Sequence, residues 1–201
     1  MSELPIKDAA TVIVIRKSGL DAPRVLLGQR GHGAVFMPGK FVFPGGAVDA
    51  ADFDTPLHGA MSAVCQARLA REVDPALAHA LPVAALRELR EETGLVIEDV
   101  TGLSFVFRAI TPPNRPRRFD ARFFLADASL ISSDMDDFSR AEDELSHLQW
   151  VTLEAARTFD MPSVTRIALR EVEAVLRAPL PPAHVPFYDH RGAVGSIRSL
   201  V

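Results

Sequence analysis

Three glutamates near the middle of the chain stand at a spacing that could bind a metal ion. Glu88, Glu91 and Glu92 occupy positions i, i+3 and i+4, and at about 100° per residue they fall on one side of a helix. Like charges at this spacing repel by roughly 0.2–0.5 kcal/mol per pair, and the helix dipole disfavours negative charge near a helix C-terminus. A hard divalent cation such as Mg²⁺, which prefers carboxylate and water oxygens, would explain the arrangement. The alternative is a solvated charged face that Arg87 and Arg90 partly neutralise, and the spacing alone does not decide between the two.

The residues around these glutamates predict a helix over residues 82–93. Pro82 is tolerated at the first helical position, and Gly94 follows directly after the last one. Ala84 and Ala85 flank the acidic face, where their small side chains would let a loop approach closely. Three apolar residues would face away from the glutamates and pack on a sheet: Val83, Leu86 and Leu89.

The chain reads Phe-Pro-Gly-Gly at 43–46, and Arg-Glu-Leu-Arg-Glu-Glu-Thr-Gly-Leu at 87–95. In these two segments the sequence resembles the Nudix hydrolase family. The family signature is a glycine-ended loop, followed by a helix with the pattern Arg-Glu-apolar-x-Glu-Glu-x-Gly-apolar, and residues 87–95 match every specified position. The resemblance covers most of the chain, because the flanking strands and the segment from Glu144 to Trp150 are also similar to the family.

This resemblance implies a Nudix-type α/β/α sandwich with a mixed β-sheet, and hydrolysis of a diphosphate bond in a nucleoside diphosphate linked to another group. Glu88, Glu91 and Glu92 would hold one or more Mg²⁺ or Mn²⁺ ions, with a backbone carbonyl from the region of Gly46. The ions would neutralise the diphosphate oxygens and activate a water for in-line attack. Arg87 would pair with a nearby glutamate and orient it rather than touch the substrate.

The general base stays open, because family members differ in where it lies. Glu88 is one candidate, and the acidic cluster of Glu142, Asp143 and Glu144 is the other. The cluster could equally be an exposed loop with no role in the reaction.

The sequence departs from the family signature by an insertion. Gly46 precedes Arg87 by 41 positions, which leaves about 27 residues more than the signature holds. Residues 50–80 are rich in alanine and predict a helical insertion inside the motif, which could form a lid or wall over the substrate, a surface elaboration or an oligomer contact. His79 stands where the family has a further glutamate, which puts the contact of that glutamate in doubt. Asp49 could supply an acidic group near the loop.

Residues 42–52, Val-Phe-Pro-Gly-Gly-Ala-Val-Asp-Ala-Ala-Asp, resemble a family branch that carries a long insertion and cleaves coenzyme A and acyl-CoA. A second signature of CoA-cleaving members is fitted by Leu26, Leu27, Arg30 and Gly39, but not by Ala34, Val35 and Met37. The resemblance implies CoA or acyl-CoA as substrate, with ADP-ribose, a nucleotide sugar or a dinucleotide as the alternative. A non-catalytic Nudix-fold ligand-binding module would be expected to lose a helix glutamate, and none is lost.

Several side chains outside the helix could meet the substrate. Arginines can bind phosphates, including a 3′-phosphate on CoA, and the candidates are Arg115, Arg117, Arg118 and Arg122. Strand alternation places Arg118 and Arg122 on one side, although a solvated strand edge explains both equally well. Phe187, Tyr188 and His190 could stack on a base, or they could belong to a tail folded over the core.

Apolar patterns predict buried strands at 9–15, 24–29, 41–43, 103–110, 119–126 and around 148–151, and a last helix from Ser163. Four prolines between 179 and 186 predict the end of regular structure, so residues 179–201 are expected to form a C-terminal tail. Strands and helices alternate, which predicts a single α/β domain over residues 1–201 with a mixed sheet between helices.

The composition is typical of one soluble domain, with 201 residues, 48% of them hydrophobic and 24% charged. A net charge of −4 argues against a nucleic-acid partner. Cys65 is the one cysteine, which favours a reducing compartment, and the sequence has neither a signal-peptide pattern nor an apolar membrane span. We therefore expect a cytoplasmic protein that binds a nucleotide-containing small molecule, without nucleic acid or membrane, and a homodimer stays open.

Overall fold

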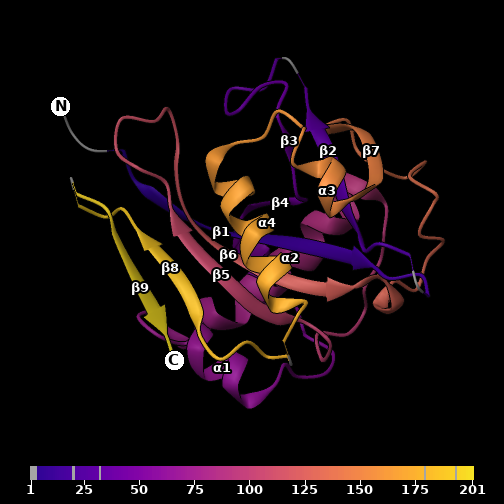
Figure 1. Cartoon of the computed structure of the whole chain (residues 1–201). Coiled ribbons are helices and arrows are strands. Elements are labelled where there is room, and N and C mark those ends of the chain that lie inside the picture. Colours follow the sequence, from indigo (N-terminus) through magenta and orange to yellow (C-terminus); the bar gives the residue numbers. More distant parts are fainter. Residues whose placement is uncertain (1–3, 20, 32, 179, 193) are drawn as a thin grey trace.

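The computed structural model describes residues 4–19, 21–31, 33–178, 180–192 and 194–201. Strands and helices alternate along the chain (Figure 1). The strands are β1 (Ile6–Arg16), β2 (Arg24–Arg30), β3 (Phe41–Val42), β4 (Gly45–Ala47), β5 (Ser104–Ile110), β6 (Arg118–Asp127), β7 (Leu145–Thr152), β8 (Val185–Asp189) and β9 (Ser196–Leu200). The helices are α1 (Ala63–Leu69), α2 (Pro75–Thr93), α3 (Leu153–Ala156) and α4 (Ser163–Val175), with short 3₁₀ turns η1 (Ala50–Phe53) and η2 (Ala128–Leu130).

In the described part of the chain, nine strands form one sheet in the order β3-β2-β1-β6-β5-β8-β9, while β4 pairs with β1 and β7 with β2. The β1–β6 and β5–β8 pairs are parallel, and the remaining pairs are antiparallel. Every residue of β5 is buried, as expected for an apolar strand that is covered on both faces. The predicted α/β class with a mixed sheet is confirmed.

Helices α2 and α4 cover opposite faces of this sheet, and α4 lies in front of it in Figure 1. On one face, α2 packs against β1 through Leu81, Ala84, Ala85 and Leu89. On the other face, α4 packs through Ala168, Leu169 and Val172. The alternating residues of β1 therefore contribute to two separate apolar cores, which fix the sheet between the helices.

Helix α2 begins at Pro75 rather than at the predicted Pro82. The side chain of Asp74 accepts hydrogen bonds from two N–H groups of the first turn, and a proline directly after such a cap needs no N–H of its own. Pro82 lies inside the helix and is buried against the core. The predicted helix end is confirmed, because Gly94 adopts the left-handed conformation, with φ of 75°, that favours glycine. The insertion at 50–80 thus contains η1, α1 and the first turns of α2.

The predicted end of regular structure in the C-terminal residues is wrong. β8 joins β5 in parallel, and β9 pairs antiparallel with β8 at the edge of the sheet. Pro186 lies within β8, although proline cannot donate a ladder hydrogen bond. The strand forms because its apolar residues Val185 and Phe187 become fully buried against the core. Pro179 lies outside the described residues.

None of the described helices is long and apolar enough to cross a membrane.

Candidate active site

The Phe-Pro-Gly-Gly loop runs directly against the glutamates of α2. The backbone N–H of Gly45 donates a hydrogen bond of 2.8 Å to Oε2 of Glu92. A Cβ atom at Gly46 would lie 2.3 Å from Oε1 of Glu88, and one at Gly45 would lie 2.5 Å from the carbonyl oxygen of Ala10 on β1. Gly45 therefore requires glycine, because any side chain there would collide with the backbone of β1, whereas a side chain at Gly46 would displace the Glu88 carboxylate.

Glu92 is buried with one carboxylate oxygen unsatisfied. Its residue exposure is 2%, and Oε1 has no hydrogen-bond partner among the described residues. Burial, together with the nearby negative charges of Glu88 and Glu144, raises the pKa of Glu92 to about 8. A buried carboxylate oxygen without a partner is costly, which points to a proton or a cation at this position.

Glu92 is buried because the helix presents it to the sheet, not to solvent. Ala85, Leu89 and Glu92 follow one another at helical spacing, and all three are buried on the side that packs on β1. Ala84 also lies in this core rather than beside an open acidic face. The predicted separation of an apolar face from a glutamate face is therefore wrong, since Glu92 belongs to the buried stripe.

Glu88 lies at the boundary between this buried stripe and solvent. Its side chain is 12% exposed, and its Oε1 accepts a hydrogen bond of 2.9 Å from Nη1 of Arg87. Burial raises the pKa of Glu88, while Arg87 lowers it and Glu91 raises it. Glu91 is turned toward Arg87 as well, with 2.9 Å between its Oε2 and the same Nη1.

Arg87 pairs with Glu88 and Glu91, and its main partner, Asp52, was not foreseen from the sequence. Nε and Nη2 of Arg87 each donate a hydrogen bond of 2.9 Å to Asp52, and Nη2 also donates to the carbonyl of Ala47. Asp52 is 1% exposed and comes from η1 at the start of the insertion. The hydrogen bond from Arg87 to Asp52 raises the pKa of Arg87 above its ordinary value. The signal in the sequence was the pair Asp49 and Asp52, which form a capping box for η1.

His79 and Asp49, the two other residues considered near the glutamates, differ in their contacts. His79 faces Thr55, with 2.9 Å between its Nε2 and the backbone carbonyl oxygen of Thr55. The Asp49 carboxylate lies 3.9 Å from Arg87 and is 69% exposed, so it is a peripheral partner of that guanidinium.

A cleft of about 880 Å³ opens beside the glutamates. Glu88, Gly45 and Gly46 line one part of it, and Glu144 lines it as well. Arg30 donates a hydrogen bond of 2.8 Å to Glu144, whose side chain is 55% exposed. Of the predicted acidic cluster, only Glu144 lines the cleft, whereas Glu142 and Asp143 are exposed outside it.

The floor of the cleft is a row of small side chains that crosses neighbouring strands. Ala9 pairs with Ala47 on one side and with Ala121 on the other, and Ala121 pairs with Ala109. Tyr188 of β8 continues the row beyond Ala109. Aromatic side chains lie around this floor, and those that line the cleft include Phe36, Phe107, Phe119 and Phe123. The row leaves a flat apolar surface between aromatic rings.

The four predicted phosphate-binding arginines are separated by the fold. Arg115 and Arg117 are exposed and line the cleft from the loop between β5 and β6. Arg122 is 1% exposed on the face away from the cleft, where it pairs with Asp8 and Asp120. Arg118 lines the cleft but is 3% exposed and donates to the carbonyls of Thr111 and His190.

Of the C-terminal residues predicted to stack on a base, only two line the cleft. Tyr188 and His190 line the cleft, whereas Phe187 is fully buried on the opposite face of β8. No described residue of the insertion lines the cleft, so the structure does not support a lid or wall, one of the roles that the sequence left open. The insertion instead lines a separate cavity of about 670 Å³, between α1 and the first half of α2.

The predicted metal ligands are only partly brought together. Over the described residues, no three Asp, Glu, His or Cys side chains form a group that could hold a metal ion as they stand. Glu88 and the unsatisfied Oε1 of Glu92 fit a cation, because both carboxylates adjoin the same glycine loop. Glu91 is held by Arg87 and would first have to leave that ion pair. The role of Gly46 as a carbonyl ligand stays a prediction.

Comparison with known proteins shows what this chain is similar to. The model of the NUDIX domain matches residues 76–173, from the first turn of α2 to near the end of α4. Nudix hydrolase 7 of Caenorhabditis elegans is 28% identical over 179 residues, which cover 72% of this chain and 51% of the relative. The chain thus spans about half the length of the curated relative it matches. Residues 76–173 are thus similar to the NUDIX domain, and the chain is similar to a Nudix hydrolase.

Solved structures agree on the fold. A Nudix hydrolase from Alicyclobacillus acidocaldarius superposes with a TM-score of 0.67 at 24% identity, covering 84% of this chain and 91% of that one. The NUDIX domain of NrtR from Shewanella oneidensis, solved with ADP ribose, superposes with a TM-score of 0.58 at 14% identity, covering 86% of this chain and 89% of that one.

Proposed function

We propose that this protein is a divalent-cation-dependent diphosphatase that cleaves a nucleoside diphosphate linked to another group. One observation carries the proposal: Glu88 and the unsatisfied Glu92 adjoin a glycine loop at the edge of a large cleft, which Glu144 also lines. This end of the cleft is rich in negative charge, so it would repel a diphosphate without a cation. Bound Mg²⁺ or Mn²⁺ would neutralise the diphosphate oxygens and activate a water.

Some residues of this chain would hold the cation, and another would position the residues that hold it. Glu88 and Glu92 are the carboxylates that would hold the cation, joined by Glu91 once it leaves Arg87. Arg87 is a positioning residue, because it binds Glu88 and Glu91 and does not line the cleft. Glu144 would take the proton of the attacking water, since it faces the cleft, is half exposed and is oriented by Arg30.

Glu88 is the second candidate for the base. The raised pKa of Glu88 favours a proton-accepting role, whereas its contact with Gly46 favours a cation-holding role. Replacing each glutamate by glutamine separates the two. If Glu144 is the base, Glu144→Gln lowers kcat and leaves the Kd for Mn²⁺ unchanged, whereas Glu88→Gln weakens Mn²⁺ binding. Glu142→Gln is the matched control, because Glu142 lies in the same loop but outside the cleft.

The remainder of the cleft fits a nucleoside with further charge. The alanine row between aromatic rings would accept a flat base, and Arg115 and Arg117 could bind phosphate at the rim. CoA and acyl-CoA carry an adenine, a diphosphate and a 3′-phosphate, and the sequence pattern at 42–52 also favours them. ADP-ribose is the alternative, supported by the ligand of the NrtR neighbour.

A hydrolysis screen with Mg²⁺ and Mn²⁺ tests the proposal. CoA, an acyl-CoA, ADP-ribose, a nucleotide sugar and a diadenosine substrate would each be incubated with the protein, and the products would be separated. We expect cleavage at the diphosphate, fastest for CoA or an acyl-CoA. Cleavage of ADP-ribose alone would replace the CoA assignment by the alternative. Tight binding of these compounds without turnover of any would show a ligand-binding module and overturn the diphosphatase.

A further inference from the structure

The insertion contacts the C-terminal strands on the side of the sheet opposite the cleft. Arg68 of α1 is 6% exposed, and it donates hydrogen bonds of 2.6 Å to the carbonyls of Pro182 and Ala183. These two carbonyls lie directly before β8. Because both bonds come from one buried guanidinium, the start of β8 is held at a fixed distance from α1.

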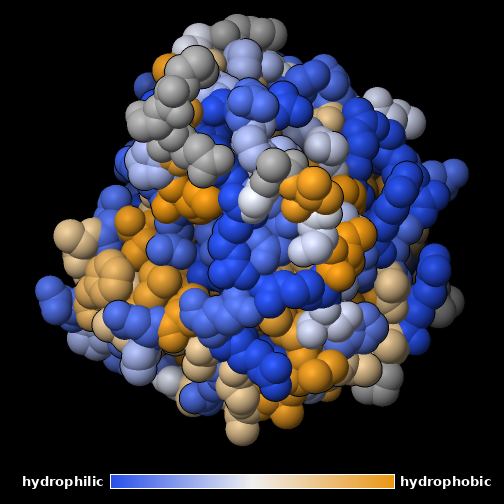
Figure 2. All heavy atoms as spheres, turned by 90° about the vertical axis from the view of Figure 1, so that its left-hand side faces the viewer, coloured by the Kyte–Doolittle hydropathy of each residue, from blue (hydrophilic) through white to orange (hydrophobic). Residues whose placement is uncertain are grey.

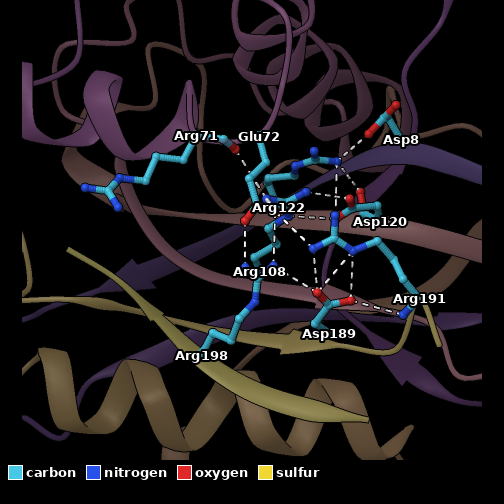
Figure 3. A network of polar contacts seen from close by, with 9 residues as sticks. All are labelled: Asp8, Arg71, Glu72, Arg108, Asp120, Arg122, Asp189, Arg191 and Arg198. Atoms are coloured by element: carbon cyan, nitrogen blue, oxygen red, sulfur yellow. Dashed lines mark hydrogen bonds and ion pairs between the residues drawn. The ribbon is translucent and has the colours of Figure 1, made fainter. Parts of the chain in front are cut away.

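A second link joins Glu72, between α1 and α2, to the residues after β8 and to β9 (Figure 3). Glu72 accepts hydrogen bonds of 3.0 Å from Arg191 and of 2.6 and 3.0 Å from Arg198. Arg198 also donates to Asp189 at the end of β8, over 2.8 Å. Glu72 has a φ of 62°, a left-handed conformation that is unfavourable for a residue other than glycine. In this conformation the Glu72 carboxylate contacts both Arg191 and Arg198.

The ring of Phe187 in β8 is enclosed by the same network. The guanidinium carbon of Arg108 lies 4.2 Å from the ring centroid, and that of Arg198 lies 4.6 Å from it. Arg108 is buried and donates hydrogen bonds of 2.9 and 2.7 Å to the carboxylate of Asp120. The side chain of Arg71 points away from the network in Figure 3, and only its carbonyl contacts Arg108.

On the opposite face of β8, Tyr188 and His190 form one wall of the cleft. Successive side chains of a strand point to opposite faces, so Phe187 and Asp189 face the network while Tyr188 and His190 face the cleft. Tyr188 packs edge-on against Phe107, with ring centroids 5.3 Å apart. A shift of β8 on the network side would therefore move this wall. Figure 2 shows hydrophilic side chains at the centre of the side that carries β8 and β9.

We propose that the insertion is a brace that sets the position of the β8 wall, with Arg68 and Glu72 as positioning residues for the nucleoside end of the substrate. The assignment to a nucleoside rests on the proposed function, whereas the position of the wall does not. Each exposed ion pair of Glu72 would contribute little to stability alone. The links converge on one strand, however, and the strand bears the cleft wall on its other face.

Tyr188 offers a direct readout, because it is the one tyrosine in the chain. Ring-labelled tyrosine gives a single set of NMR signals that reports on the wall without any ligand. We expect Glu72→Gln, which removes the charge and keeps the shape, to shift or broaden these signals. Glu154→Gln, at an exposed position on α3, is the matched control and should leave them unchanged. An unchanged Tyr188 signal in Glu72→Gln at intact fold would overturn the brace.

Binding and turnover then test the link to the nucleoside. For Glu72→Gln we expect the Kd for ADP, and the KM of the substrate, to rise by about tenfold, less than the roughly hundredfold that a 1 Å misplacement can cause. The kcat and the Kd for Mn²⁺ should stay unchanged. In a Tyr188→Ala background, Glu72→Gln should add little, since it acts through that side chain. A lower Tm with an unchanged Kd for ADP would reduce the network to a stabilising role and overturn positioning. An altered Tyr188 signal in a protein that cleaves nothing would overturn only the proposed function.

Discussion

Two clusters of arginines and carboxylates in this protein have similar residues but differ in how the charges are satisfied. In the network beneath β8, Glu72 and Asp189 each accept hydrogen bonds from arginines, which lower the pKa of both to about 2. At the glycine loop, Glu92 keeps one oxygen without a partner, and burial raises its pKa to about 8. A carboxylate with its countercharge in place holds the fold, whereas one left without it is available for a ligand.

The largest expected effect comes from replacing Glu92, the carboxylate with an unsatisfied oxygen. Glu92→Gln should lower kcat/KM by on the order of 10²–10³-fold, the scale seen when one charge-stabilising group is removed from an active site. The fold should persist, because the amide keeps the oxygen that accepts from Gly45. Steady-state kinetics and thermal unfolding of the variant would measure both, with Glu142→Gln as the control. Turnover at the wild-type rate would contradict the cation-holding role of Glu92.

The satisfied cluster should respond in the opposite way. Asp120 lies between the buried Arg108 and Arg122, so Asp120→Asn leaves two guanidinium groups short of countercharge. We expect the free energy of unfolding to fall by about 3 kcal/mol, as when one partner of a buried pair is removed. Urea unfolding would measure this, against Asp54→Asn at an exposed position. A loss below about 0.5 kcal/mol would show that Asp120 is not a main support of the network.

The two clusters should also give opposite pH dependences. The folded protein keeps a proton on Glu92 between the ordinary carboxyl range and pH about 8, while the unfolded chain has lost it. The free energy of unfolding should therefore fall as pH rises through this window, by at most about 1.4 kcal/mol per pH unit. The stability contributed by Glu72 and Asp189 is present at these pH values and is lost only as pH falls toward 2.

Thermal unfolding between pH 5 and 9 without divalent metal would show the Glu92 contribution. The slope should be absent in Glu92→Gln, and Mg²⁺ should reduce it, because a cation competes with the proton. A slope of the same size in the variant would assign the pH dependence to another group.

The difference between the clusters also explains what could be foreseen from the sequence. Residues 87–95 predicted the site helix and its end at Gly94, because helical spacing and a glycine cap are local signals. The burial of Glu92 could not be foreseen, since it depends on β4 and β1 packing against that helix. Asp52 reaches Arg87 from a distant segment, and Glu72 reaches β8 and β9 in the same way. Such pairings depend on the path of the insertion, which no periodicity encodes.

Strand β8 shows a different limit of sequence reasoning. Its prolines indicated a tail, and proline does weaken a strand. The outcome was decided by burial of Val185 and Phe187 and by pairing with β5, both of which are tertiary. Once the strand forms, the alternation of its residues separates the network face from the cleft face.

The smallest expected effect concerns the rim of the cleft. Arg115 and Arg117 are exposed there and belong to neither cluster. Arg117→Ala and Arg115→Ala should lower kcat/KM for CoA by at most about fivefold each, because an exposed charge contact is worth roughly 0.2–1 kcal/mol. Dephospho-CoA, which lacks the 3′-phosphate, should be affected less, so the preference for CoA should shrink. Arg170→Ala, at an exposed position of α4, is the control. An equal loss for both substrates would place these arginines on the diphosphate instead, and an unchanged ratio with unchanged rates would remove them from substrate binding.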